Sequence, residues 1–190
     1  MIDRHLDDHL RTIERLREQR ADIERIAVLM IDCLAGRGRV FWLGNGGSAA
    51  DSQHLASELV GRFERDRPGL ASIALTTDSS ALTAIGNDYG FEQIFARQVE
   101  ALCRPGDLVI GISTSGNSPN VLRAMEKARA LGVMTAGFSG RGGGRLKGAV
   151  DACLIAPSDN TARIQEAHLL VGHILCDLVE ARFAPPAATA

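Results

Sequence analysis

The sequence lacks long apolar segments and any surplus of basic residues. No apolar run approaches the roughly 20 residues that span a bilayer, so no membrane partner is expected. The formal net charge is −2, whereas nucleic-acid-binding domains usually carry an excess of lysine and arginine. The first segment, MIDRHLDDHLRT, also lacks the charged-then-apolar layout of a signal peptide.

Cys-x-x-Cys pairs are absent as well. The four cysteines are scattered, and three of them lie within apolar runs, which indicates buried free thiols. Together with the missing leader pattern, this predicts a cytoplasmic protein. The 190 residues, 45% hydrophobic and 23% charged, suit one globular domain with a sizeable core.

Short apolar runs alternate with stretches of helical periodicity. Strands are predicted at 40–43, 71–75, 108–112, 133–138 and 152–155. Helices are predicted at 3–35, 49–63, 79–87, 92–102, 119–131, 142–147 and 161–182. Apolar strands separated by helices are typical of a parallel sheet covered on both faces. We therefore predict an α/β fold, in which a domain at 36–182 holds a five-stranded parallel sheet, with a helical arm of the same domain at 1–35 and a flexible tail at 183–190.

Ligands of such sheets bind at the carboxyl ends of the strands, and the most informative loop there is Ser113–Ser118. It presents several hydroxyl groups and backbone N–H groups before a helix in which Ser118 suits the N-cap and Pro119 the first position. This arrangement suits a phosphate, because free N–H groups and the helix dipole favour negative charge. The lysine-bearing P-loop pattern is absent, which argues against hydrolysis of nucleoside triphosphates.

The turn at 44–47 follows a predicted strand and allows two interpretations. With Ser48 and Ala49 it matches the G-x-G-x-x-A variant of a dinucleotide fingerprint. However, the acidic residue expected about 20 positions later does not stand at a strand end. Asp78, which does follow a strand, comes 34 residues after Gly44. The sequence therefore favours another anion over a nicotinamide or flavin cofactor.

His54 and Glu58 are spaced i, i+4, so their side chains meet on one helix face. Such a pair can chelate a divalent metal, act as a base with its orienting partner, or simply face solvent. Gln165, His168 and His173 lie within an apolar helix and require partners there. Gln165 and His173 are roughly 12 Å apart along a straight helix, so Gln165 and His168 form the locally easier pair. A shared ion would require long side chains, a distorted helix or another subunit.

Four segments carry a resemblance to a known family. They are GNGGSAADSQHLASELVGRF, AIGNDYGFEQIFARQVEAL, GISTSGNSPNV and ARIQEAHLLVGHIL. Together they resemble the sugar isomerase (SIS) domain of bacterial phosphoheptose isomerases, over nearly the whole chain to about residue 182. The resemblance implies a parallel α/β sandwich and a homotetramer with active sites near subunit interfaces. It also implies conversion of sedoheptulose 7-phosphate to D-glycero-D-manno-heptose 7-phosphate, the first step towards nucleotide-activated heptose.

The resemblance further implies roles for individual residues. Substrate contacts are expected from Asn45, Gly46, Gly47, Ser48, Glu58, Asn87, Asp88, Ser113, Thr114, Ser115, Ser118 and Gln165, with the serine loop holding the phosphate. One zinc ion per subunit is expected at His54, Glu58, Gln165 and His173. Glu58 and His173 match the family's base and acid, and His168 becomes a supporting residue. Ala162 stands where some members carry an acidic residue, which leaves any polar role at that position in question.

These residue types suit aldose–ketose isomerisation, which requires a base, an acid and stabilisation of an enediolate. The main alternative is a non-catalytic SIS tetramer that binds a replication initiator, of the DnaA initiator-associating protein type, which TTDSSALTAI and ILCDLVE also resemble. The presence of both Glu58 and His173 favours the isomerase. A sugar-phosphate-sensing SIS module and an isomerase of a different sugar, such as arabinose 5-phosphate, are two weaker candidates.

Overall fold

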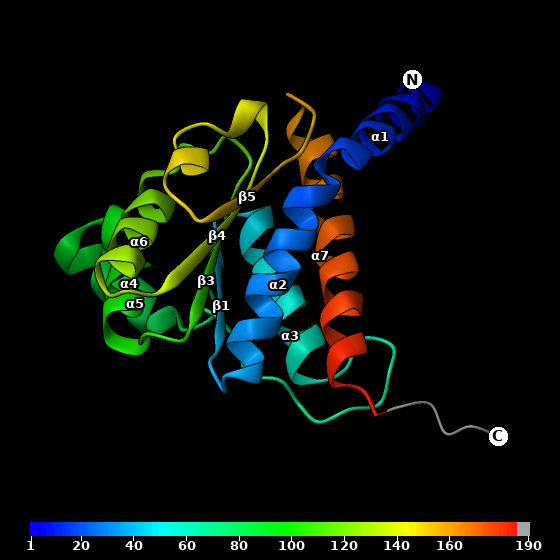
Figure 1. Ribbon diagram of the computed structural model, residues 1–190. Helices are drawn as coiled ribbons and strands as arrows, with labels where there is room; N and C mark the ends of the chain where they lie inside the picture. The colour runs from blue at the N-terminus through cyan, green and yellow to red at the C-terminus, as the bar shows by residue number, and fades with distance from the viewer. Residues whose placement is uncertain (186–190) are drawn as a thin grey trace.

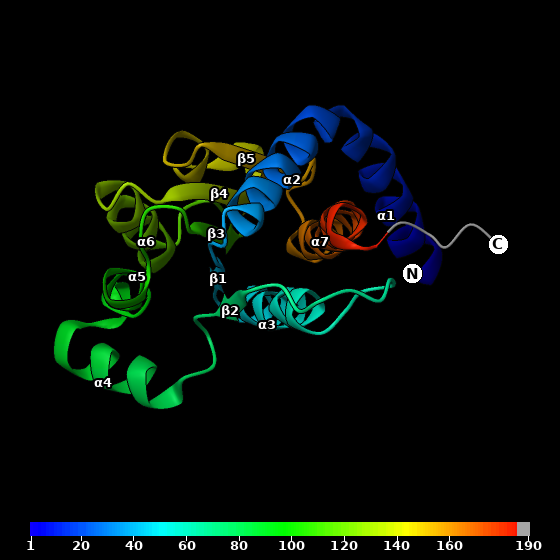
Figure 2. The same ribbon diagram turned by 60° about the horizontal axis from the view of Figure 1, so that its bottom comes forward.

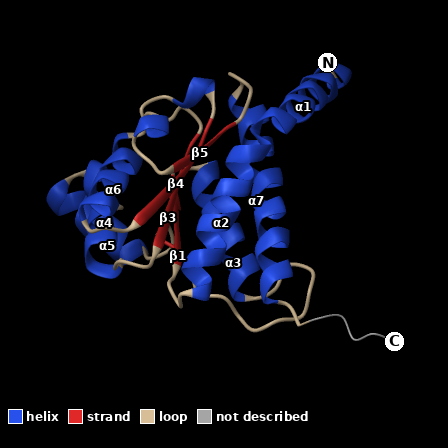
Figure 3. Ribbon diagram, in the orientation of Figure 1, coloured by secondary structure: helices blue, strands red, loops and turns tan. Residues whose placement is uncertain are grey.

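The computed structural model describes residues 1–185 and confirms the predicted α/β fold (Figures 1 and 3). One parallel sheet has the strand order β2-β1-β3-β4-β5. Its strands coincide with the predicted ones and are β1 (Val40–Gly44), β2 (Ser72–Ala74), β3 (Leu108–Ser113), β4 (Met134–Ser139) and β5 (Ala152–Ile155). No helix among residues 1–185 is long and apolar enough to cross a membrane.

Helices cover both faces of the sheet and complete three layers. They are α1 (Ile2–Leu16), α2 (Arg20–Ala35), α3 (Gly47–Val60), α4 (Ser79–Tyr89), α5 (Ala96–Leu102), α6 (Pro119–Ala130) and α7 (Thr161–Phe183). On one face lie α2, α3 and α7, and on the other α5 and α6 (Figure 1). Figure 2 shows α4 at the outer edge of the second layer, where none of its residues is buried.

Strand β1 explains why the predicted strands are apolar throughout. Val40 and Trp42 belong to the core beneath α2, α3 and α7, whereas Phe41 and Leu43 belong to the core beneath α5 and α6. Successive side chains of a strand point to opposite faces, so a strand covered on both faces needs apolar residues at every position. The pairing of β1 with β3 also places the turn after Gly44 beside the loop after β3.

The N-terminal helix differs from the prediction of one helix over 3–35. A 3₁₀ turn at η1 (Arg17–Gln19) separates α1 from α2. The Gln19 side chain accepts a hydrogen bond from the backbone N–H of Ile155 at 3.3 Å, so the break is anchored to the end of β5. Because this contact is long-range, the helical periodicity did not reveal it. The separation of an arm at 1–35 from the rest of the domain stays a prediction.

The predicted helix at 142–147 is wrong. Two short turns replace it: η3 (Arg141–Gly143), whose backbone is not helical, and the 3₁₀ turn η4 (Leu146–Gly148). Gly142, Gly143 and Gly144 all have positive φ values, of 75°, 101° and 54°, which no right-handed helix accommodates. At the other end, α7 continues to Phe183, and residues 186–190 of the predicted tail lie outside the described residues.

An ion pair between the buried Asp107 and the half-buried Arg39 joins the amino-terminal ends of β1 and β3. The Asp107 side chain is 5% exposed, and its Oδ2 lies 2.8 Å from Arg39 Nη2. The carboxylate also accepts hydrogen bonds from the backbone N–H groups of Arg39 at 2.9 Å and Arg104 at 2.8 Å. Burial alone would raise the pKa of Asp107, but the Arg39 and Arg104 hydrogen bonds outweigh it and lower the pKa below 3.8.

We expect Asp107→Asn to lower the free energy of unfolding by about 2 kcal/mol at neutral pH, because it removes charge-assisted hydrogen bonds. A carboxylate with a lowered folded pKa stabilises the protein above its unfolded pKa and loses this effect as pH falls through the folded pKa. The difference between wild type and variant should therefore shrink below pH 3.8. Urea unfolding of both proteins above and below pH 3.8 measures the difference in the free energy of unfolding. A difference that does not change with pH would contradict a lowered pKa of Asp107.

Candidate functional site

Three hydroxyl groups converge in the loop between β3 and α6. The Oγ of Ser113, a buried residue at the end of β3, lies 2.9 Å from Ser118 Oγ and 3.5 Å from Ser115 Oγ. Ser118 occupies the predicted N-cap position, but its side chain makes no capping hydrogen bond. The hydroxyls therefore gather at a helix N-terminus, where the helix dipole favours an anion.

The glycine turn after β1 is tied to this loop by two asparagines. Asn45 Nδ2 donates to Asn120 Oδ1 at 2.9 Å, and Asn120 Nδ2 donates to Asn45 Oδ1 at 2.8 Å. Asn120 is only 2% exposed, and its Oδ1 also accepts from the backbone N–H of Val121 at 2.9 Å. Asn120 therefore holds the turn and the start of α6 together. The sequence analysis missed it, although a polar residue in the first turn of a buried helix signals a need for partners.

Gln165 lies against the glycine turn. A Cβ atom on Gly47 would collide with the terminal amide of Gln165, so the absence of a side chain at Gly47 lets this amide lie directly against the turn. Gly46 has a φ of +57°, which glycine also adopts most readily. Ser48 is 4% exposed and lies beneath the turn. The predicted residues Asn45, Gly46, Gly47 and Gln165 thus form one neighbourhood.

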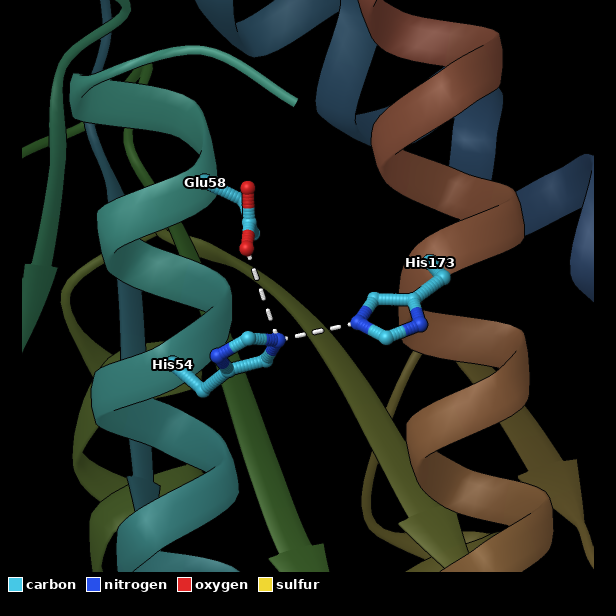
Figure 4. A group of neighbouring side chains, drawn as sticks. All are labelled: His54, Glu58 and His173. Carbon is cyan, nitrogen blue, oxygen red and sulfur yellow. Dashed lines mark hydrogen bonds and ion pairs between the residues drawn. The ribbon is translucent and has the colours of Figure 1, made fainter. Parts of the chain in front are cut away.

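A second group lies further along α3, where α3 and α7 run side by side (Figure 4). His54 Nε2 lies 2.9 Å from His173 Nε2 and 3.5 Å from Glu58 Oε1. One ligand atom from each of these three residues lies within 4.8 Å of the others. Close packing sets the helix spacing here, because a Cβ atom on Gly172 would collide with the Leu55 side chain.

The chemistry of this group fits a divalent transition metal. Zinc binds imidazole nitrogen and carboxylate oxygen at about 2.0–2.2 Å, so tetrahedral ligand atoms stand roughly 3.3 Å apart. The contacts of 2.9 and 3.5 Å bracket that spacing. Catalytic zinc sites often use three protein ligands and keep one position open. Gln165, the fourth predicted ligand, lies at the glycine turn instead, roughly two helical turns from His173.

The remaining predicted contacts lie on other parts of the fold. Asn87 and Asp88 are exposed at the end of α4, where Asn87 Nδ2 donates to Asp88 Oδ1 at 2.8 Å. Thr114 is half-buried in the hydroxyl loop. A cleft of about 440 Å³ is lined by residues of both the glycine turn and α4, among them Asn45 and Leu82. Asn87 and Asp88 are not among its lining residues.

His168 has a structural role. Its side chain is buried, and Nε2 lies 3.0 Å from the carbonyl oxygen of Ser139 at the end of β4. Burial lowers the pKa of His168 to about 4, although the hydrogen bond to Ser139 opposes this shift. The ring is therefore neutral near pH 7 and ties α7 to the sheet. The four cysteines are free and buried, as predicted, and burial raises the pKa of each thiol to about 12.

Comparison with known proteins identifies a family. The sequence model of the SIS domain matches residues 4–140. A phosphoheptose isomerase of Nitratiruptor sp. is 52% identical over 183 residues, covering 96% of this chain and 98% of the relative.

Solved structures agree. A phosphoheptose isomerase from Neisseria gonorrhoeae has a TM-score of 0.89 at 42% identity, covering 95% of this chain and 97% of that one. A phosphoheptose isomerase from Francisella tularensis has a TM-score of 0.91 at 40% identity, covering 95% of this chain and 96% of that one.

We expect His173→Ala to weaken Zn²⁺ binding at least tenfold, or by about 1.4 kcal/mol, because it removes one of the three candidate ligands. His9→Ala is the matched control, since His9 pairs with Glu166 at 2.7 Å outside this group. Competition with a chromophoric chelator measures both affinities. Affinity should also fall in acid, because imidazole binds metal only when neutral. Equal zinc affinity in the two variants would rule out the assignment of His173 as a ligand.

Proposed function

The chain belongs to the phosphoheptose isomerase family of SIS domain proteins, and we propose that it converts sedoheptulose 7-phosphate to D-glycero-D-manno-heptose 7-phosphate. The convergence of His54, Glu58 and His173 carries the proposal. It supplies a carboxylate and two imidazoles, in a chain that also carries a phosphate-suited loop and is 52% identical to a phosphoheptose isomerase. The relatives named above do not favour the initiator-binding alternative.

We propose that the phosphate binds the hydroxyl loop, where Ser113, Ser115 and Ser118 converge. Electrostatics support this phosphate site, because the hydroxyl groups and the N-terminus of α6 both favour an anion. Further substrate contacts are proposed at Asn45, Gly46, Gly47, Ser48, Thr114, Asn87, Asp88 and Gln165. Holding the phosphate away from the reacting carbons fixes their position and lowers the entropic cost of reaction.

We propose Glu58 as the base and His173 as the acid. Glu58 removes a proton from C1 of the open ketose, and the electron pair forms a C1–C2 double bond. The C2 oxygen then takes a proton from His173, which gives an enediol. Glu58 then delivers a proton to C2, and the C1 hydroxyl returns its proton to His173, which produces the aldose and restores both groups. The packing of α3 against α7 brings base and acid together, because the Glu58 and His173 side chains both contact His54.

Zinc is the metal we propose for this site, one ion per subunit. Two imidazole nitrogens and a carboxylate support zinc over magnesium or calcium, which prefer oxygen ligands. When bound, the ion would polarise the substrate oxygens that gain negative charge. His54, Glu58 and His173 would hold it, and Gln165 would join them only by moving from its place beside Gly47.

We propose a homotetramer whose active sites lie near subunit interfaces. Leu170, Ile174 and Leu178 on α7 form an apolar stripe beside His173, and they are 37%, 37% and 38% exposed. On α1, Leu6 and Leu10 are 57% and 64% exposed. Contiguous exposed apolar stripes favour burial against another subunit. A cytoplasmic location is also proposed, because four buried free thiols suit a reducing compartment.

Leu10→Arg is expected to lower the solution mass measured by light scattering, because it places a charge in the proposed interface. Met134→Arg is the control, since Met134 is 43% exposed at the start of β4. Its mass should stay that of the wild type. A monomeric wild-type protein would contradict the assembly.

Glu58→Gln should abolish turnover while leaving sugar phosphate binding. General base catalysis contributes typically 10²- to 10⁴-fold, so kcat should fall by at least about 10²-fold. NMR detection of aldoheptose phosphate measures turnover, and isothermal titration measures binding. Glu126→Gln, on the exposed face of α6, is the control. Wild-type turnover in Glu58→Gln would refute the base assignment.

A further inference from the structure

A buried carboxylate lies on α7 beyond His173. Glu180 is fully buried and accepts hydrogen bonds from the backbone N–H groups of Phe63 at 2.9 Å and of Glu64 and Arg65 at 2.7 Å each. Seven residues, roughly 10 Å of helix, separate it from His173. Burial alone would raise the pKa of Glu180, but these hydrogen bonds and nearby Arg67 lower it. The carboxylate is therefore charged, and it holds the segment that follows α3.

Arg67 links this carboxylate to the end of α3. Its Nε lies 3.3 Å from Glu180 Oε1, and both side chains are fully buried. Its guanidinium also donates to the carbonyl oxygens of Glu58 at 2.8 Å, Leu59 at 2.7 Å and Gly61 at 3.1 Å. The last carbonyls of a helix have no partners within the helix. Arg67 therefore caps α3 through the backbone of the residue that carries the proposed base.

Phe63 connects the same segment to the reactive group. Its ring stacks on the His173 ring, with centroids 5.4 Å apart and planes inclined by 28°. The backbone N–H of Phe63 is one of those that Glu180 holds. Glu180 thus acts on both helices: it sits on the helix of His173, and through Arg67 and Phe63 it reaches Glu58 and the His173 ring.

We propose that Glu180, Arg67 and Phe63 form a positioning clamp that sets the distance and orientation of His173 relative to His54 and Glu58. None of the three supplies an atom to the three-residue group. The expected effect of the clamp on turnover rests on the proposed function. Its effect on ring geometry and metal affinity can be measured independently of any substrate.

A buried ion pair could instead contribute only stability. The pair of Arg39 and Asp107 provides a matched comparison, because Asp107 is also buried, pairs with an arginine and accepts backbone N–H groups. It lies at the amino-terminal edge of β3, whereas the three-residue group lies between α3 and α7. Asp107→Asn is therefore the control: it removes a comparable ion pair away from the three-residue group, so any effect it has comes from lost stability alone.

The test compares Glu180→Gln with Asp107→Asn in the full-length protein. Glutamine keeps the shape but places an N–H₂ group against N–H donors. We expect Glu180→Gln to weaken Zn²⁺ binding and to lower kcat about tenfold or more, as loss of a group that orients metal ligands usually does, with KM changed less than about threefold. The ¹⁵N and ¹H signals of the His54 and His173 rings should shift in metal-free protein. Asp107→Asn should leave all of these at wild-type values.

Phe63→Leu keeps the ion pair and an apolar side chain against the core but removes the ring that stacks on His173. It should move the His173 ring signals and weaken zinc binding even if Glu180→Gln does not fold. Wild-type ring signals and zinc affinity in Phe63→Leu and in any folded Glu180→Gln would overturn the clamp. A wild-type protein inactive on sedoheptulose 7-phosphate would refute the proposed function instead, because the ring signals and metal affinity still decide the clamp.

Discussion

The close contact between α3 and α7 is the constraint on which the candidate site depends. His54 and Glu58 belong to one helix and His173 to the other, so their meeting is a property of tertiary packing. Gly172 against Leu55 permits the approach. The 2.9 Å contact between the His54 and His173 imidazoles therefore exists only while the two helices are packed together. A change in helix spacing would therefore affect the acid, the base and the proposed metal ligands together.

In the proposed function, binding and chemistry occupy two different parts of the fold. Hydroxyl groups and the glycine turn stand at the carboxyl ends of β3 and β1, where parallel sheets usually bind ligands. The reactive side chains lie along the helices on one face of the sheet. The paired asparagines 45 and 120 couple the turn to the loop, and α3 begins at that turn. The glycine turn and the proposed base are therefore carried on one continuous piece of chain, and the hydroxyl loop reaches them through the asparagine pair.

Much of this was predictable from local sequence pattern, because strands buried on both faces and a helical i, i+4 pair leave clear signals. The five strands, the hydroxyl loop and the pairing of His54 with Glu58 follow from such patterns. Long-range polar contacts leave no comparable signal. Asn120 and Phe63 find their hydrogen-bond partners 75 and 117 residues away along the chain. The glycines at 142–144 were misread because periodicity ignores positive φ.

The most direct test of the central claim is isomerisation of sedoheptulose 7-phosphate by the zinc-loaded protein in D₂O, followed by NMR. Proton transfer through an enediol at Glu58 exposes the carried proton to exchange with solvent. The account predicts D-glycero-D-manno-heptose 7-phosphate with deuterium at C2. No aldose product from the zinc-loaded protein would contradict it.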